Sequence, residues 1–270
     1  MDNRAIGVFD SGLGGLTVFK EITEQLPGES VIYFGDSGRA PYGTKSRETV
    51  IKYTLQDIRF LMNHDIKMMV IACNTMCAIS YEFIKNGVDI PIIEVIGAGA
   101  TTAIAETKNK KIGIIGTSAT INSGAYQKAI NKLDNNIEIV QKACPLFVPL
   151  AEEGQEWWGH DITLRIAEEY LTPLKETGVD TLVLGCTHYP LLQAAISKVM
   201  GENVKLVSSA MEVARVVKKT ILDNNMQRDT RFNPVYRYYT SDSVEKFEPL
   251  CSAILGRTVK SAEKVDIEKY

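Results

Sequence analysis

The stretch Met69-Val70-Ile71-Ala72-Cys73-Asn74-Thr75 is an apolar run that ends in a cysteine followed by two polar residues. Later in the chain, Thr181-Leu182-Val183-Leu184-Gly185-Cys186-Thr187-His188 follows the same plan. Continuous apolar runs are typical of strands buried on both faces of a parallel sheet. In open α/β sheets, ligands bind at the carboxyl ends of such strands. The two stretches therefore predict an α/β fold with Cys73 and Cys186 at two ligand-binding strand ends.

Other short apolar runs alternate with helical patterns along the chain, which indicates βαβ units around mainly parallel sheets. The predicted strands, including the two that end in cysteine, are residues 5–10, 31–36, 68–74, 92–95, 111–117, 137–142, 181–186, 205–209, 236–241 and 259–262. A helix is expected between the last two strands, at about 244–255.

Apolar residues at helical spacing predict the buried faces of two further helices. The two sets are Ile51, Leu55, Ile58 and Met62, and Ile162, Ile166 and Tyr170. Thr172-Pro173 is expected to kink or end the second of these helices, because proline disrupts a helix interior.

A sequence pattern that occurs twice suggests that the chain contains a duplicated α/β unit. Gly7-Val8-Phe9-Asp10-Ser11 resembles Gly113-Ile114-Ile115-Gly116-Thr117, an offset of 113 − 7 = 106, and the cysteines are offset by 186 − 73 = 113. Short strand–loop sequences also recur by chance in α/β proteins. If the duplication is real, a pseudo-two-fold axis brings both sets of strand ends to a shared cleft. Cys73 and Cys186 then approach one ligand from opposite sides.

The composition is that of an ordinary globular protein, with 45% apolar and 23% charged residues among 270. This length suits one large domain or two of ordinary size. A net charge of −3 argues against nucleic acid or an anionic membrane as the main partner. No apolar stretch is long enough to span a bilayer, and the amino terminus lacks the features of a signal peptide. Five cysteines, an odd number, indicate a reduced, cytoplasmic setting.

The two strand-end cysteines have three possible roles. As catalytic groups they would act as thiolates, which the amino terminus of a following helix favours. As structural residues they would be small buried hydrophobes, the role assigned to Cys77, Cys144 and Cys251. As metal ligands, Cys73 and Cys77 would join Cys186 and His188 in a tetrahedral zinc site. Zinc is disfavoured, since Cys77 falls a turn into the expected helix and no C-x2-C pair is present.

Polar residues follow several other predicted strands. Asp10-Ser11-Gly12-Leu13-Gly14-Gly15 opens a helix and suits a small anion, but it lacks the spacing of a nucleotide fingerprint. Asp10 could instead serve only as a helix cap. His188 could hydrogen-bond a thiolate or a substrate, or be a packed histidine. The loops at Gly35-Asp36-Ser37 and Pro41-Tyr42-Gly43-Thr44 read as binding loops or as plain turns. Glu152 could border the cleft or simply contact solvent.

Together these residues resemble the glutamate racemases of the bacterial cell-wall pathway. The resemblance covers almost the whole chain and rests on five motifs in the family's order. They are Gly7-Val8-Phe9-Asp10-Ser11-Gly12-Leu13-Gly14-Gly15-Leu16, Gly35-Asp36-Ser37, Pro41-Tyr42-Gly43, Val70-Ile71-Ala72-Cys73-Asn74-Thr75 and Leu184-Gly185-Cys186-Thr187-His188-Tyr189-Pro190. The family commonly has threonine where this chain has Ser37, which keeps the hydroxyl.

The resemblance implies two α/β domains, the first made of residues 1–97 and 207–270 and the second of about 98–206, with the active site in the cleft between them. It implies an enzyme that needs no cofactor and no metal, acts on L- and D-glutamate in the cytoplasm, supplies D-glutamate for peptidoglycan and forms a homodimer. One cysteine removes the α-proton of glutamate and the other protonates the opposite face. Cys73 is expected to work on D-glutamate and Cys186 on L-glutamate.

The same resemblance implies roles for further residues. Asp10 and His188 are the expected proton-handling neighbours of the two thiols, and Glu152 is a third. The expected substrate-binding residues are Asp10, Ser11, Tyr42, Gly43, Asn74, Thr75, Thr117, Thr120, Thr187 and His188. Two other functions remain open at this point. One is an aspartate or hydantoin racemase of the same superfamily, and the other is a non-catalytic binding protein for a small dicarboxylate with idle cysteines.

Overall fold

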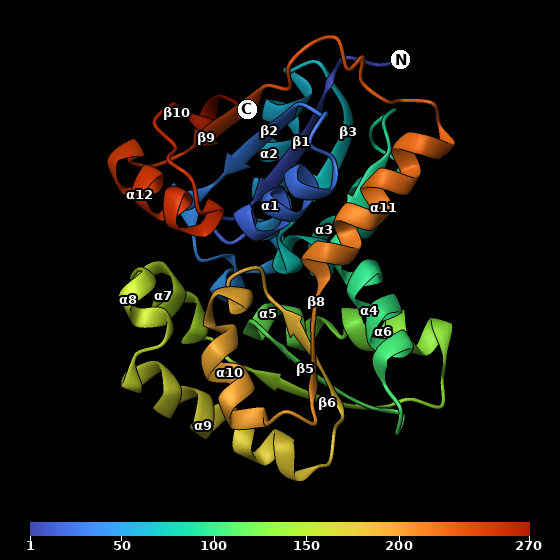
Figure 1. The fold of residues 1–270 in the computed structure, drawn as a ribbon, viewed down its shortest axis with the longest axis vertical. Helices are drawn as coiled ribbons and strands as arrows, with labels where there is room; N and C mark the ends of the chain where they lie inside the picture. Colours follow the sequence, from blue (N-terminus) through green and yellow to red (C-terminus); the bar gives the residue numbers. More distant parts are fainter.

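A computed structural model describes residues 1–270, and it has two lobes, each built on its own parallel sheet (Figure 1). The first sheet has the strand order β10-β9-β2-β1-β3-β4 and the second has the order β6-β5-β7-β8, with every pairing parallel. The predicted α/β class with two mainly parallel sheets is therefore confirmed. The strands are β1 Ala5–Asp10, β2 Val31–Gly35, β3 Ile66–Ile71, β4 Ile92–Glu94, β5 Lys111–Gly116, β6 Glu138–Ala143, β7 Thr181–Gly185, β8 Lys205–Ser208, β9 Tyr236–Thr240 and β10 Ala262–Lys264.

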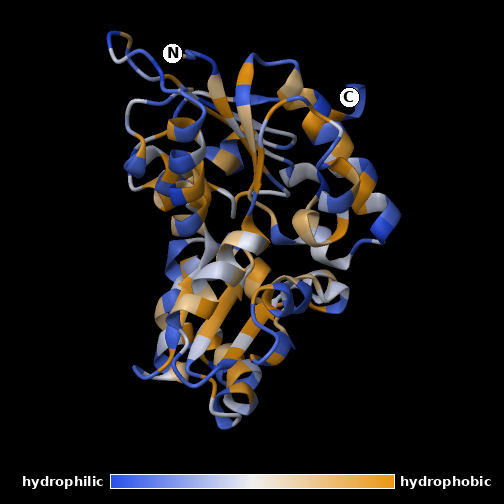
Figure 2. Cartoon of the chain, turned by 90° about the vertical axis from the view of Figure 1, so that its right-hand side faces the viewer, coloured by the Kyte–Doolittle hydropathy of each residue, from blue (hydrophilic) through white to orange (hydrophobic).

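Helices cover the sheets and leave the apolar strands inside (Figures 1 and 2). They are α1 Leu16–Gln25, α2 Arg47–Met62, α3 Asn74–Ile84, α4 Val95–Glu106, α5 Ser118–Ser123, α6 Ala125–Leu133, α7 Phe147–Glu152, α8 Gln155–Trp158, α9 Asp161–Glu176, α10 Gln193–Met200, α11 Ser209–Asp223 and α12 Val244–Leu255. Short 3₁₀ turns are η1 Ser37–Arg39, η2 Tyr42–Thr44, η3 Tyr189–Leu192 and η4 Ile267–Lys269. None of the helices combines the length and apolar character needed to cross a membrane.

The sequence pattern that occurs twice corresponds to a repeated strand order. Four strands of the first sheet run β2-β1-β3-β4, and the second sheet repeats this as β6-β5-β7-β8. Each cysteine strand therefore lies beside the strand that carries the matching glycine motif, β3 beside β1 and β7 beside β5. The equivalent strand ends are the ones that carry Cys73 and Cys186.

The chain leaves the first sheet through α4 after β4 and returns through α11 before β9. Both chain ends lie in the first lobe (Figure 1). The predicted boundary at residue 98 falls inside α4, and the one at 206–207 falls inside β8. This division of the chain into two domains stays a prediction.

The predicted apolar stripes of α2 and α9 are wrong in part. Met62 is 40% exposed and Ile162 is 46% exposed. The buried residues of α9 are Thr163, Ala167, Leu171 and Leu174, whereas those of α2 are Val50, Thr54, Gln56, Asp57, Ile58, Phe60 and Leu61. Polar residues such as Thr163 and Asp57 are buried because they find hydrogen-bond partners, which apolar periodicity does not register. The helix α9 also continues beyond Pro173 to Glu176, so this proline does not end it.

Candidate active site

The carboxyl ends of β1, β3 and β7 meet at one small cavity between the lobes. Cys73 follows β3 and occupies the N-cap position of α3, and Cys186 directly follows β7. Both thiols line this cavity together with Ser11, Ala40, Pro41, Tyr42, Gly43, Asn74, Thr75, Thr117, Val148, Glu152, Thr187 and His188. The two cysteines are similarly enclosed, with exposed fractions of 4% for Cys73 and 6% for Cys186.

The cavity is tightly closed. Its volume of about 20 Å³ holds little more than one water molecule, so a larger ligand enters only when the lobes part or the lining side chains move. Two glycines allow the close approach of the lobes. A Cβ atom at Gly43 would lie 2.6 Å from the Cβ of Thr117, and one at Gly14 would lie 2.6 Å from Nδ1 of His188.

The surroundings of Cys73 keep it as a thiol. Burial and the nearby Asp10 carboxylate raise the pKa of Cys73 to about 12, against the opposing hydrogen bonds from Ser11 and the Met76 N–H. Its Sγ lies 3.3 Å from Oγ of Ser11. Asp10 is fully buried at the end of β1, and it accepts hydrogen bonds from the Gly12 N–H at 3.0 Å and the Thr187 hydroxyl at 3.1 Å. Burial raises the pKa of Asp10 despite these contacts and the His188 charge.

The surroundings of Cys186 have the opposite electrostatic character. Its Sγ lies 3.7 Å from Nδ1 of His188, and Nε2 of His188 lies 2.9 Å from Oε1 of Glu152. Burial would lower the pKa of His188, but its bonds to Cys186 and Glu152 outweigh burial and raise that pKa well above its usual value. In the same way, burial would raise the pKa of Glu152, but the bond to His188 lowers it. A charged imidazole therefore lies between the Cys186 thiol and the Glu152 carboxylate.

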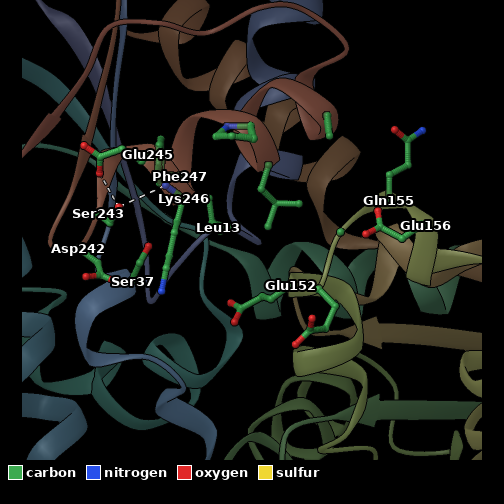
Figure 3. A pocket seen from close by; sticks show the side chains of 15 residues that line it. Leu13, Ser37, Glu152, Gln155, Glu156, Asp242, Ser243, Glu245, Lys246 and Phe247 are labelled. Carbon is green, nitrogen blue, oxygen red and sulfur yellow. Dashed lines mark hydrogen bonds between the residues drawn. The ribbon is translucent and has the colours of Figure 1, made fainter.

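Glu152 also faces a second and larger cavity of about 600 Å³ on the outer side of the cleft. In Figure 3, Glu152 lies on one side of this cavity, and Asp242 and Lys246 lie on the other side. The Glu152 side chain is 34% exposed, whereas that of His188 is 6% exposed. The row Cys186–His188–Glu152 therefore leads from the enclosed thiol towards solvent.

Hydroxyl and amide groups join α3 to the second lobe beside Cys73. The Thr75 hydroxyl lies 2.9 Å from that of Thr117 and 3.3 Å from that of Thr120. Next to them, the Tyr126 hydroxyl donates to Oδ1 of Asn74 at 2.7 Å. These contacts hold the first turn of α3 against α5 and α6 when the lobes are together.

The loop that carries Tyr42 and Gly43 is anchored by a buried charged cluster. Arg39 donates to Oδ2 of Asp36 at 2.7 Å and to Oδ1 of Asp57 at 3.1 Å. The Tyr42 hydroxyl donates to the Asp36 carboxylate rather than into the cavity. Burial, followed by the charge of Asp36, raises the pKa of Asp57 well above its usual value. The cluster therefore fixes a loop that covers one side of the cavity.

Most of the residues that line the cavity were predicted from the sequence, with a few differences. Asp10 and Thr120 lie one layer behind the lining, where they contact Thr187 and Thr75. Three residues of the site were not predicted: Ala40 and Val148 line the cavity, and Tyr126 is the hydrogen-bond partner of Asn74. Pro41 stood in a quoted motif but was given no role.

The structure does not assemble the zinc site considered as an alternative. Sγ of Cys77 is turned towards the carbonyl oxygen of Ile71, 3.4 Å away, and Cys77 does not line the cavity. No group of three histidine, cysteine or carboxylate side chains in residues 1–270 is placed to hold a metal ion. All five cysteines are buried free thiols.

Racemases are among the known proteins that are similar to this chain in sequence and fold. Residues 6–217 match the family model described as Asp/Glu/Hydantoin racemase. A glutamate racemase of Geobacter metallireducens is 48% identical over 265 residues, which are 98% of this chain and 97% of that protein. The crystal structure of a glutamate racemase isoform from Bacillus anthracis has a TM-score of 0.94 at 40% identity, covering 98% of both chains. A glutamate racemase from Francisella tularensis, solved in complex with D-glutamate, has a TM-score of 0.92 at 39% identity over 100% of both chains. The chain therefore belongs to the Asp/Glu/Hydantoin racemase family, as an isomerase of its glutamate racemase branch.

Proposed function

We propose that the protein interconverts L- and D-glutamate by a two-base mechanism in which Cys73 and Cys186 act on opposite faces of the α-carbon. The observation that carries this proposal is that both thiols line one small cavity, each from the end of a parallel strand in a different lobe. The 48% identity to a glutamate racemase supports glutamate over aspartate or a hydantoin as the substrate.

After one turnover, the enzyme differs from its starting form only in which of the two cysteines carries a proton. In the L-to-D direction, the Cys186 thiolate removes the α-proton and becomes a thiol. The Cys73 thiol then donates its proton to the other face of the carbanion and becomes a thiolate. The reverse direction exchanges these roles, with Cys73 acting on D-glutamate. No electron is transferred, and we propose that no cofactor or metal takes part.

The chemical difficulty is the weak acidity of the α-proton, because no cofactor is proposed to delocalise the carbanion. Hydrogen-bond donors that face the α-carboxylate stabilise the charge that develops there, and they act most strongly where water is excluded. The closed cavity offers such donors in the hydroxyl groups of Ser11, Thr75, Thr117 and Thr187 and in the amide of Asn74. We assign these side chains, with Gly43 and Tyr42 on the covering loop and Thr120 behind Thr75, to substrate binding.

We assign proton handling to the groups behind each thiol. His188 stabilises the Cys186 thiolate, and Glu152 holds the charge of His188. Since Glu152 also faces the outer cavity, we propose that it returns the Cys186 proton to solvent between turnovers. Asp10, whose pKa is raised by burial, is placed beside Cys73 to accept its proton in the D-to-L direction. We propose, from the family, that the enzyme supplies D-glutamate for peptidoglycan in the cytoplasm and works as a homodimer.

Single Cys73→Ala and Cys186→Ala variants test the proposal. The purified proteins are incubated with L- or D-glutamate in D₂O, and optical rotation and α-deuteration are followed. Each variant should lose racemisation, and each should still exchange the α-proton of one enantiomer only, Cys186→Ala that of D-glutamate and Cys73→Ala that of L-glutamate. Cys77→Ala, which removes a buried thiol outside the cavity, is the matched control. Racemisation by either cleft variant would contradict the two-base mechanism. A binding protein with idle cysteines would show no exchange even in its native form.

A further inference from the structure

The amide of Asn74 is only half satisfied. Asn74 lines the cavity beside Cys73, and its Oδ1 accepts a hydrogen bond from the Tyr126 hydroxyl at 2.7 Å. Its Nδ2 is fully buried and has no hydrogen-bond partner. A buried amide N–H without a partner costs free energy, so such groups are rare unless a ligand completes them. The unpaired donor of a cavity-lining residue points to an acceptor on the substrate.

The fold makes a dedicated space for Tyr126. Its ring is 1% exposed and comes from α6 in the second lobe, whereas Asn74 belongs to α3 in the first. Two glycines border it. A Cβ atom at Gly185 would lie 3.0 Å from Cε2 of Tyr126, and one at Gly99 would lie 3.2 Å from its hydroxyl oxygen. Larger residues at either position would displace the ring, so the hydroxyl is held at one place relative to Asn74.

In the structure the Tyr126 hydroxyl is the donor of this hydrogen bond and Oδ1 of Asn74 is the acceptor. Burial raises the pKa of Tyr126 well above its usual value, so the hydroxyl keeps its proton and can donate it. An asparagine side chain can rotate to exchange its oxygen and its NH₂ group with little other cost. Donation by Tyr126 favours the orientation with Oδ1 towards the ring and NH₂ away from it. The opposite orientation would present a carbonyl oxygen to an anionic substrate.

We propose that Tyr126 is a positioning residue that orients the Asn74 amide, so that its NH₂ group donates to a carboxylate oxygen of the substrate. The inference rests on the proposed function in that it places glutamate in this cavity. Because the hydrogen bond crosses between the lobes, the donor is correctly oriented only when the cleft is closed. Tyr126 thereby couples cleft closure to assembly of the binding site.

A double-mutant cycle tests this role. The values of kcat/KM for racemisation are measured in both directions for the native protein, Tyr126→Phe, Asn74→Ala and the double variant. Phenylalanine fits the same space and removes only the hydroxyl. We expect Tyr126→Phe to lower kcat/KM about fivefold, which is the effect of losing one neutral hydrogen bond of about 1 kcal/mol. In the Asn74→Ala background the same substitution should change kcat/KM less than about twofold, since the amide it orients is gone.

Tyr238→Phe is the matched control, because Tyr238 is similarly buried and its hydroxyl contacts Arg257 away from the cleft. Its kcat/KM should equal that of the native protein. The inference is overturned if Tyr126→Phe leaves kcat/KM unchanged, or if its loss multiplies with that of Asn74→Ala. If Asn74→Ala is too slow to assay, dissociation constants of D-glutamate from calorimetry close the same cycle. The result of this double-mutant cycle does not depend on which groups transfer the α-proton. Failure of the two-base mechanism would instead appear in the cysteine variants.

Discussion

The two thiols should differ sharply in reactivity although they are equally enclosed. With a pKa of about 12, Cys73 is about one part in ten thousand thiolate at pH 8, against about one quarter for an ordinary cysteine. This lowers the thiolate population roughly 2,400-fold. A more basic thiolate is a better nucleophile, which returns a factor of about 40 for a pKa difference of about 3.5 and a Brønsted slope of about 0.45. Cys73 should therefore react about 60-fold more slowly than an ordinary thiol, and Cys186, beside the His188 imidazolium, should react first.

The assay is limited labelling with methyl methanethiosulfonate at pH 8, followed by peptide mass spectrometry over time. The exposed fractions of 4% and 6% make access to the two thiols comparable, so a difference in rate reports on ionisation. Asp10→Asn removes a negative charge that raises the pKa of Cys73, and it should speed labelling of Cys73. Labelling of Cys73 as fast as, or before, Cys186 in the native protein would refute the reasoning.

Two further perturbations test the cleft and the loop that covers it. Gly43→Ala places a methyl group 2.6 Å from the Cβ of Thr117, so the loop should shift. We expect kcat/KM to fall about 100-fold with little change in melting temperature. An unchanged kcat/KM would show that the lobes need not approach this closely. Because the pKa of Asp57 is raised, the folded protein keeps a proton on Asp57 that the unfolded chain loses above about pH 4. The free energy of unfolding should therefore decrease by about 1.4 kcal/mol for each unit of pH increase, until Asp57 ionises in the folded protein. Asp57→Asn should flatten this part of the pH dependence of denaturant-unfolding free energy, and an identical slope in both proteins would contradict the assignment.

The strands that carry the cysteines were predictable because they are buried on both faces. Continuous apolar sequence is required there, and the change to polar residues marks the strand end within two or three residues. The last strand, β10, lies at 262–264 instead of the predicted 259–262, since it is an edge strand whose residues are half-buried or exposed and carry no apolar signal. The helix α12 was predicted at its observed bounds of Val244–Leu255.

The candidate site was predictable to the extent that its residues follow strand ends in recognisable motifs. Tyr126 and Val148 lie in no such motif, because their place in the site comes from contacts between the lobes. A contact of this kind depends on how two sheets are oriented, which no local sequence pattern records. The position of Asp10 behind the cavity lining has the same origin, since Thr187 of the other lobe donates a hydrogen bond to its carboxylate.

The difference between the two thiols has a thermodynamic consequence for the proposed mechanism. Burial opposes a thiolate at Cys73, whereas the His188 imidazole lies 3.7 Å from Sγ of Cys186, so under the proposed mechanism we expect the free enzyme to be ready to accept L-glutamate. The two enantiomers have equal free energies, so kcat/KM must be the same in both directions when the free forms interconvert rapidly. The difference between the two thiols can therefore appear only in the separate values of kcat and KM. Binding of D-glutamate requires a proton to move from Cys73 before the productive complex forms, which raises KM for D-glutamate. The complex so formed lies higher in free energy and closer to the shared transition state, which raises kcat for D-glutamate by the same factor.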